Sequence, residues 1–330
     1  CSRVRSGGGW GGGRGGGKWG TGRQAMAESL YGDPGFYKAS GAPAHHFRTA
    51  AHTGQTWTTA IARLATEVDV ALGEPADFTV VDIGAGGGEL LAGLADIVPG
   101  RWSLLGVDVA ERPAGLSRRV DWQRGFPDQV HGLVLAVELL DVVPVNVVEL
   151  TDQGPCVIEV DEDGFERIGG PVDPPDHQWL SQWWPIGSAG ERAEIGSRRD
   201  EMWHDITSRV ATGLAVAVDY AADPSRVLDG TLAGYRDGHR RLPAPDSTMD
   251  LTAHVLFESL LVEGDVLLSQ REALRRLGVA ATPPEYRGDG DTYLAELTKA
   301  SEAAELLNPY GLGGFTWLWH SVGMKLPRLG

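Results

Sequence analysis

The stretch that most constrains this chain is residues 80–90, where an apolar run ends in Asp82 and then breaks into glycines before a helical pattern begins. Glycine adopts positive φ without steric cost, and it lets backbone N–H groups approach a ligand with no Cβ in the way. A strand, a glycine turn and a helix in this order are typical of the first unit of a doubly wound α/β sheet. The sequence therefore predicts a Rossmann-like α/β fold with a nucleotide loop at residues 84–88.

The spacing of the loop glycines separates two classes of cofactor. Gly84, Gly86 and Gly88 form G-x-G-x-G, whereas the dinucleotide fingerprint G-x-G-x-x-G would place its third glycine one residue later. Asp82 stands where enzymes that use S-adenosylmethionine (SAM) commonly carry an acid. Asp108 ends a second apolar stretch twenty residues past Gly88, the usual position of a carboxylate that binds ribose hydroxyls. These five residues predict a SAM site, and they disfavour both a nicotinamide-dependent oxidoreductase and a plain βα turn.

Composition excludes several other classes of protein. The chain has 330 residues and is 42% hydrophobic, which is enough for one large α/β domain with insertions. No apolar run approaches the roughly 18 residues of a membrane span, and no signal peptide is visible, so we expect a cytoplasmic protein with no membrane partner. Two cysteines and no Cys/His spacing of the zinc type predict no metal site.

Charge is unevenly distributed along the chain. The net charge is −16, yet residues 1–25 hold five basic residues and no acid, so the remainder is more acidic still. Because an acidic protein repels the phosphate backbone of nucleic acids, we expect no nucleic-acid partner. Residues 1–25 carry glycine triplets that can bury almost nothing, which predicts a disordered Gly-rich extension. The alternatives are an RGG-like RNA-binding arm and an upstream misread start ahead of Met26.

The remaining patterns predict a core with an insertion. Residues 26–75 form an N-terminal helical segment, residues 76–160 and 212–330 the core, and residues 161–211 an inserted cap. Short strands are expected over residues 145–168 and helices over residues 176–211. Residues 250–255 are expected to begin a helix whose N-cap is Asp250 and which carries His254. Seven or so sheet strands are expected, and the clearest lie at 80–83, 103–107, 119–122, 132–137, 213–218, 265–269 and 314–323.

Two carboxylates follow the fourth of these strands. Glu138 and Asp141 lie at its carboxyl end, which in an open α/β sheet is the edge where ligands bind. They are our candidates for catalytic groups, Glu138 first and Asp141 second. The alternative is that they cap the following helix or hold the cofactor.

Taken in order, several motifs resemble one known family. They are residues 30–37, the loop 84–90, residues 138–145, 219–220, 230–235 and 250–255, and a helix starting at Gln270. This series is similar to the MidA-like SAM-dependent methyltransferases, whose mitochondrial members assist respiratory complex I assembly by methylating an arginine. The resemblance covers most of residues 26–330. It implies a class I SAM-methyltransferase fold, a seven-stranded sheet with helical and β insertions that form a substrate cap, and a protein substrate.

Two positions depart from the family pattern. The asparagine expected before Glu138 is Val137, and the aspartate of a Gly-Asp-Phe-x-Thr loop is replaced by His46. Both lie near where cofactor and substrate should meet. Two functions therefore stay open, a methyltransferase acting on a protein side chain, by resemblance arginine, and a methyltransferase-fold assembly factor that has lost catalysis.

Overall fold

The computed structural model describes residues 19–38, 54–225 and 228–326, and the chain divides into two compact units. The unit that we call the sheet unit comprises residues 48–139, 205–220 and 262–330. The unit that we call the insertion unit comprises residues 1–47, 140–204 and 221–261. Each unit is described by itself.

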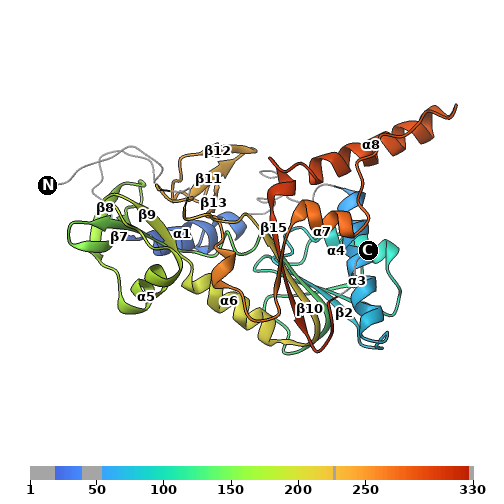
Figure 1. Ribbon diagram of the computed structural model, residues 1–330, viewed down its shortest axis with the longest axis horizontal. Coiled ribbons are helices and arrows are strands. Elements are labelled where there is room, and N and C mark those ends of the chain that lie inside the picture. Colours follow the sequence, from blue (N-terminus) through green and yellow to red (C-terminus); the bar gives the residue numbers. More distant parts are fainter. Residues whose placement is uncertain (1–18, 39–53, 226–227, 327–330) are drawn as a thin grey trace. The chain divides into compact units, whose positions relative to one another are not determined.

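A seven-stranded sheet forms the centre of the sheet unit (Figure 1). The strand order is β14-β15-β10-β5-β2-β3-β4, in which the five strands from β10 to β4 run parallel and β15 is antiparallel to both of its neighbours. The bounds are β2 Thr79–Ile83, β3 Ser103–Val107, β4 Val120–Gln123, β5 Val130–Val137, β10 Val210–Asp219, β14 Val266–Ser269 and β15 Thr316–Val322. The predicted α/β fold and its seven-stranded sheet are confirmed.

Helices and strands of this unit share one apolar core. The helices are α3 Gln55–Ala71, α4 Glu89–Ile97, α7 Gln270–Arg276 and α8 Gly290–Leu306, with the 3-10 helix η4 at Leu312–Gly314. All four α-helices contribute buried side chains to the cluster around the sheet (Figure 1). In α3 the apolar residues recur at helical spacing, and Trp57 packs edge-to-face on Trp317 of β15 with ring centroids 5.5 Å apart. Central strands β5 and β10 are almost continuously buried, as parallel strands covered on both faces must be.

The insertion unit contains two antiparallel sheets. The larger joins β1 Gly20–Thr21, β7 Gly154–Val160, β6 Asn146–Thr151 and β9 Arg192–Ile195 in that order, with β8 Glu166–Pro171 also paired to β7. The smaller has the order β12 His239–Arg241, β11 Ala233–Arg236 and β13 Asp250–Thr252. The helical elements are α1 Gly22–Tyr31, η1 Phe36–Lys38, α5 Pro174–Trp183, η3 Phe257–Ser259 and α6 Ser197–Ser208, which ends in the sheet unit.

Two segments predicted as helix are strands instead. Residues 192–195 form β9 because Arg192 and its neighbours pair with β6, and Arg192 forms ion pairs with Glu149 and Glu166 at 3.0 and 2.8 Å. Residues 250–252 form β13, whose pairing partner is β11. Asp250 is therefore a buried strand residue rather than a helix cap. Strands β6 and β7, predicted to belong to the core, pair within the insertion unit, which begins at residue 140 rather than 161.

The predicted disorder of residues 1–25 is wrong at its end. Gly20 and Thr21 pair with Val160 and Glu159 of β7, and α1 already begins at Gly22. The Thr21 hydroxyl accepts the Gln24 N–H at 3.3 Å while the Gln24 side chain accepts the Thr21 N–H at 2.9 Å, a reciprocal capping box. Residues 1–18 and 45–49, the latter including His46, lie outside the described residues.

Candidate functional site

The glycine loop of the sheet unit has the backbone that its sequence requires. Gly84, Gly86 and Gly88 have φ of +75°, +55° and +75°, a region that favours glycine. A Cβ at Gly84 would lie 2.9 Å from Leu139 Cδ1, and one at Gly88 would lie 3.0 Å from Leu116 Cδ1. By contrast, among the described residues other than its chain neighbours, no atom lies within 4 Å of a Cβ built at Gly86. The loop is thus packed closely at both ends and open at its middle.

Asp108 joins this loop to the end of β3. Its Oδ2 accepts the Gly86 N–H and its Oδ1 accepts the Ala110 N–H, both at 2.8 Å. Burial raises the pKa of Asp108, and the N–H donors of Ala110, Gly86 and Val109 oppose that rise. A carboxylate has about four acceptor positions, so Asp108 can accept further hydrogen bonds from a ligand. Val109, the next residue, is an exposed apolar side chain beside it.

Asp82 is a buried acid at the end of β2. Its side chain is 6% exposed, and its backbone lies between Gly106 of β3 and Leu135 of β5 in the sheet. Burial, followed by the charges of Asp108 and Glu89, raises the pKa of Asp82 from 3.8 to about 7. Asp82 therefore changes its charge near neutral pH, unlike an ordinary aspartate.

Glu138 lies in a strained backbone position at the carboxyl end of β5. Its φ is +52°, and its N–H donates to the Val218 carbonyl of the neighbouring β10 at 2.8 Å. The following side chain, Leu139, is the one that meets Gly84 of the glycine loop. Positive φ at a residue other than glycine costs of order 1 kcal/mol or more, and such strain clusters at functional sites. Glu138 thus belongs to the same end of the sheet as the loop.

Asp141 belongs to the insertion unit and not to the sheet unit. It is 4% exposed, and burial raises its pKa to about 6 although the charge of Arg199 opposes the rise. Its backbone carbonyl accepts Arg199 Nη2 at 3.1 Å and the Ala253 N–H at 3.0 Å. The structure therefore separates the two predicted catalytic carboxylates, which are three residues apart in sequence, into different units.

Sequence reasoning missed a buried acid and its phenol beside Asp141. The Tyr37 hydroxyl donates to Asp250 Oδ1 at 2.8 Å, and burial together with Asp141 raises the pKa of Asp250 to about 7. His254 lies in a loop after β13, where its N–H donates to the Thr231 hydroxyl at 2.8 Å and burial lowers its pKa. Both Tyr37 and Asp250 lie in the family motifs, but only the fold reveals their contact.

The described residues contain no group of three or more His, Cys, Asp and Glu side chains that could hold a metal ion. In the same ranges, no helix is both long and apolar enough to cross a membrane.

A sheet of this order with a glycine loop after β2 is the fold of SAM-dependent methyltransferases, and two solved proteins of Burkholderia thailandensis share it. One, solved with bound S-adenosyl-homocysteine, superimposes with a TM-score of 0.77 at 22% identity over 94% of this chain and 89% of its own. The other, an uncharacterised protein in native form, gives 0.76 at 22% identity over 94% and 90%. At this identity the likeness establishes the fold.

Residues 106–268 match the family described as "Putative S-adenosyl-L-methionine-dependent methyltransferase". This match bears out the resemblance that the motifs indicated, and both the matched segment and the fold are similar to those of SAM-dependent methyltransferases. No curated protein matches the chain significantly.

Proposed function

We propose that the protein binds SAM at the glycine loop of the sheet unit and transfers the methyl group of SAM to an arginine side chain of another protein. The observation that carries the proposal is the position of Glu138, whose backbone has a strained positive φ and which precedes Leu139, the residue that packs on Gly84. The family resemblance supports arginine as the acceptor. The net charge of −16 favours a protein acceptor over nucleic acid.

The loop residues fit this cofactor. The open side of Gly86 leaves backbone room for a ligand, and Asp108 has acceptor capacity left for ribose hydroxyls. Asp82, Gly84 and Gly88 complete the cofactor-binding set, since the glycines shape the turn and Asp82 supplies a buried acid. When bound, SAM supplies an electrophilic methyl group on a sulfonium that is already a good leaving group.

The chain then has to position the acceptor and take a proton. A guanidinium is cationic at physiological pH and offers five donors in a rigid fork, which a carboxylate can bind in bidentate geometry. As the acceptor nitrogen forms its new N–C bond, the S–C bond breaks with both electrons going to sulfur, and the Glu138 carboxylate accepts the proton that the nitrogen loses. Asp141 is the second candidate for this role.

The test is Glu138→Gln, which keeps the shape of the side chain and removes its charge. We expect methylation of acceptors in a host lysate with labelled SAM to fall by about a hundredfold or more, with SAM affinity by calorimetry within a few fold of wild type. Glu263→Gln, on the exposed surface of the same unit, is the matched control.

Two other outcomes would redirect the assignment. If SAM affinity collapses in Glu138→Gln, the residue is a cofactor ligand rather than a base. If wild-type protein binds SAM yet labels no acceptor, the chain is a methyltransferase-fold assembly factor without catalysis, as the Val137 and His46 departures allow.

A further inference from the structure

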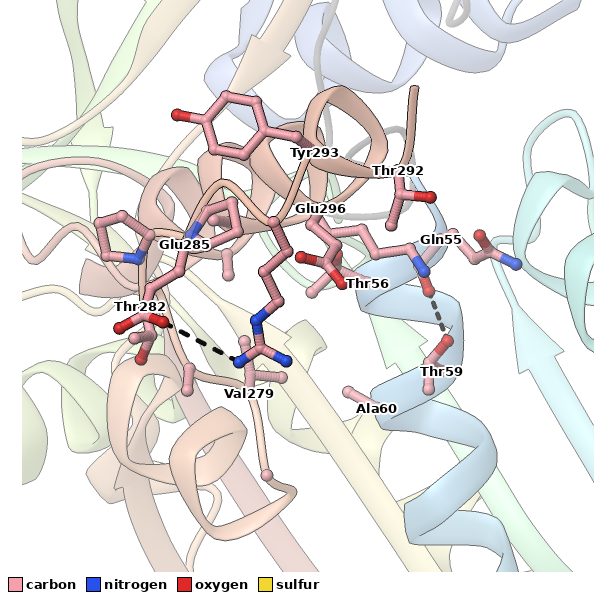
Figure 2. Close-up of a pocket in the computed structure, with 18 of the residues that line it drawn as sticks. Gln55, Thr56, Thr59, Ala60, Val279, Thr282, Glu285, Thr292, Tyr293 and Glu296 are labelled. Carbon is pink, nitrogen blue, oxygen red and sulfur yellow. Dashed lines mark hydrogen bonds and ion pairs between the residues drawn. The ribbon is translucent and has the colours of Figure 1, made fainter. Parts of the chain in front are cut away.

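An open groove of about 830 Å³ lies in the sheet unit (Figure 2), and its lining includes no residue of the glycine loop. Three segments line it: the start of α3, the connection between α7 and α8, and one side of α8 from Thr292 to Ala303. In Figure 2, Gln55 and Thr59 project from α3 on one side, and Tyr293 and Glu296 come from α8 on the other. No residue of the proposed methyl-transfer site is among its lining residues.

Helix α8 buries very little of its length. Of its 17 residues, Ala303 and Leu306 are buried, and residues 290–301 contain no buried side chain. Figure 1 shows this helix running outward from the rest of the sheet unit. Isolated helices of about 12 to 15 residues are marginal in water, and most helices in proteins are stabilised by packing of an apolar face. The first three turns of α8 therefore lack the packing that normally stabilises a helix.

Helix α8 nevertheless carries an apolar stripe. Tyr293, Leu297, Ala300 and Ala304 recur at i, i+4, i+7 and i+11, which places them on one face of the helix. Leu297 is 37% exposed, and its neighbour Leu294 is 60% exposed.

The stripe is continuous with the groove. Tyr293 and Ala300 line the groove, and the exposed Tyr286 contacts the Tyr293 ring edge-to-face with centroids 5.6 Å apart. An apolar surface thus runs from the groove onto the outer face of α8.

The charges around this surface are mostly negative. Residues 285–305 contain six carboxylates and two basic side chains. One of the basic residues, Arg287, already pairs with Glu285 at 4.0 Å (Figure 2). A second copy of the chain would bring the same carboxylates against one another, which is unfavourable. A positively charged partner would be attracted to them.

We propose that this groove and the apolar stripe of α8 dock an amphipathic, positively charged helical segment of another protein. Its apolar face would cover Tyr293 and Leu297, and its lysines or arginines would meet Glu296 and the neighbouring carboxylates. This is the helix-in-groove mode of recognition, in which residues at i, i+3, i+4 and i+7 anchor the bound helix. The inference is independent of the methyl acceptor and of the reaction.

The experiment uses the full chain and two labelled synthetic peptides of about 18 residues. Both place leucines at i, i+4, i+7 and i+11, and one carries lysines on its flanking faces where the other carries glutamates. By fluorescence anisotropy we expect the lysine peptide to bind at least about tenfold more tightly than the glutamate peptide, with an affinity that falls as salt rises.

Variants locate the binding surface. The double variant with Leu294→Gln and Leu297→Gln keeps the helix propensity of α8 and removes apolar surface. Binding of the lysine peptide to it should therefore weaken by about tenfold or more. Glu296→Lys should weaken the lysine peptide and strengthen the glutamate peptide. Val70→Gln, at an apolar position on α3 about as exposed as Leu294, should change the binding of neither peptide. Circular dichroism and SAM calorimetry show whether each variant remains folded.

Three results would overturn the proposal. The first is that neither peptide binds, and the second is that both bind equally. The third is that light scattering shows a dimer that the Leu294 and Leu297 variant dissociates, because a second copy would then cover this surface.

Discussion

Replacing Asp82 with asparagine should stabilise the protein in a manner that depends on pH. The asparagine keeps the size of the side chain and cannot ionise, whereas burial raises the pKa of Asp82 from 3.8 to about 7 in the folded chain. The folded state therefore holds this proton more tightly than the unfolded state does. Below pH 3.8 both states are protonated and ionisation costs nothing, whereas above pH 7 both are ionised and the full cost applies.

The magnitude follows from the two pKa values. Each pKa unit is worth about 1.4 kcal/mol, so the raised pKa of Asp82 destabilises the folded state by about 1.5 kcal/mol at pH 5, where only the unfolded state is ionised, and by about 4 kcal/mol at pH 8. Asp82→Asn avoids this cost at both pH values. Its stability gain over wild type should therefore be about 2.5 kcal/mol larger at pH 8 than at pH 5. Any constant effect of asparagine on packing or hydrogen bonding cancels in that difference.

Urea unfolding followed by circular dichroism at pH 5 and pH 8 measures the difference, without SAM present. Asp96→Asn, at an exposed position of α4, controls for the loss of one negative charge. If wild type and Asp82→Asn differ by the same free energy at both pH values, Asp82 is not held protonated by burial, and the reasoning fails.

Two further predictions concern the cofactor and the N-terminal segment. Asp108→Ala should weaken SAM binding at least about tenfold, because hydrogen bonds to a charged group contribute about 1.5 to 3 kcal/mol each; unchanged affinity in calorimetry, or tighter binding of NADH than of SAM, would contradict the assignment. Deleting residues 1–18 should leave the melting temperature unaltered, whereas deleting residues 1–25 removes β1 and the Thr21 cap of α1 and should lower it by several degrees. Equal melting temperatures for the two deletions would show that the cap contributes nothing.

The sheet unit could be predicted because its signals are local. Strands β2, β3, β5 and β10 are buried apolar runs, and a parallel strand covered on both faces requires such a run whatever its neighbours are. The backbone conformation of the glycine loop could likewise be predicted, because glycine adopts positive φ without steric cost. The SAM-site prediction depends on the loop glycines, on Asp82 near the end of β2 and on Asp108 directly after β3.

The insertion unit could not be predicted as well because its pairing is distant. Strand β9 was assigned to helix since its partner, β6, lies more than forty residues earlier, at Asn146–Thr151. Asp250 resembled a helix cap from its neighbours alone, yet its partner Tyr37 is 213 residues away in sequence. Neither the pairing of β9 with β6 nor the contact of Asp250 with Tyr37 produces a periodic pattern of residues in the sequence.

The features least visible in sequence are those where the chain departs from its local preferences. Glu138 occupies a positive φ that a glutamate rarely adopts, and Asp82 keeps an acid where burial opposes its charge. Glu138 follows the buried strand β5, and Asp82 lies within the buried strand β2. A bound cation offsets the cost of an ionised Asp82, because an opposite charge nearby favours the ionised form. The cost of keeping an acid at this buried position is therefore what we expect of a site that holds a positively charged ligand such as SAM. Local sequence preferences explain the core better than they explain such a site.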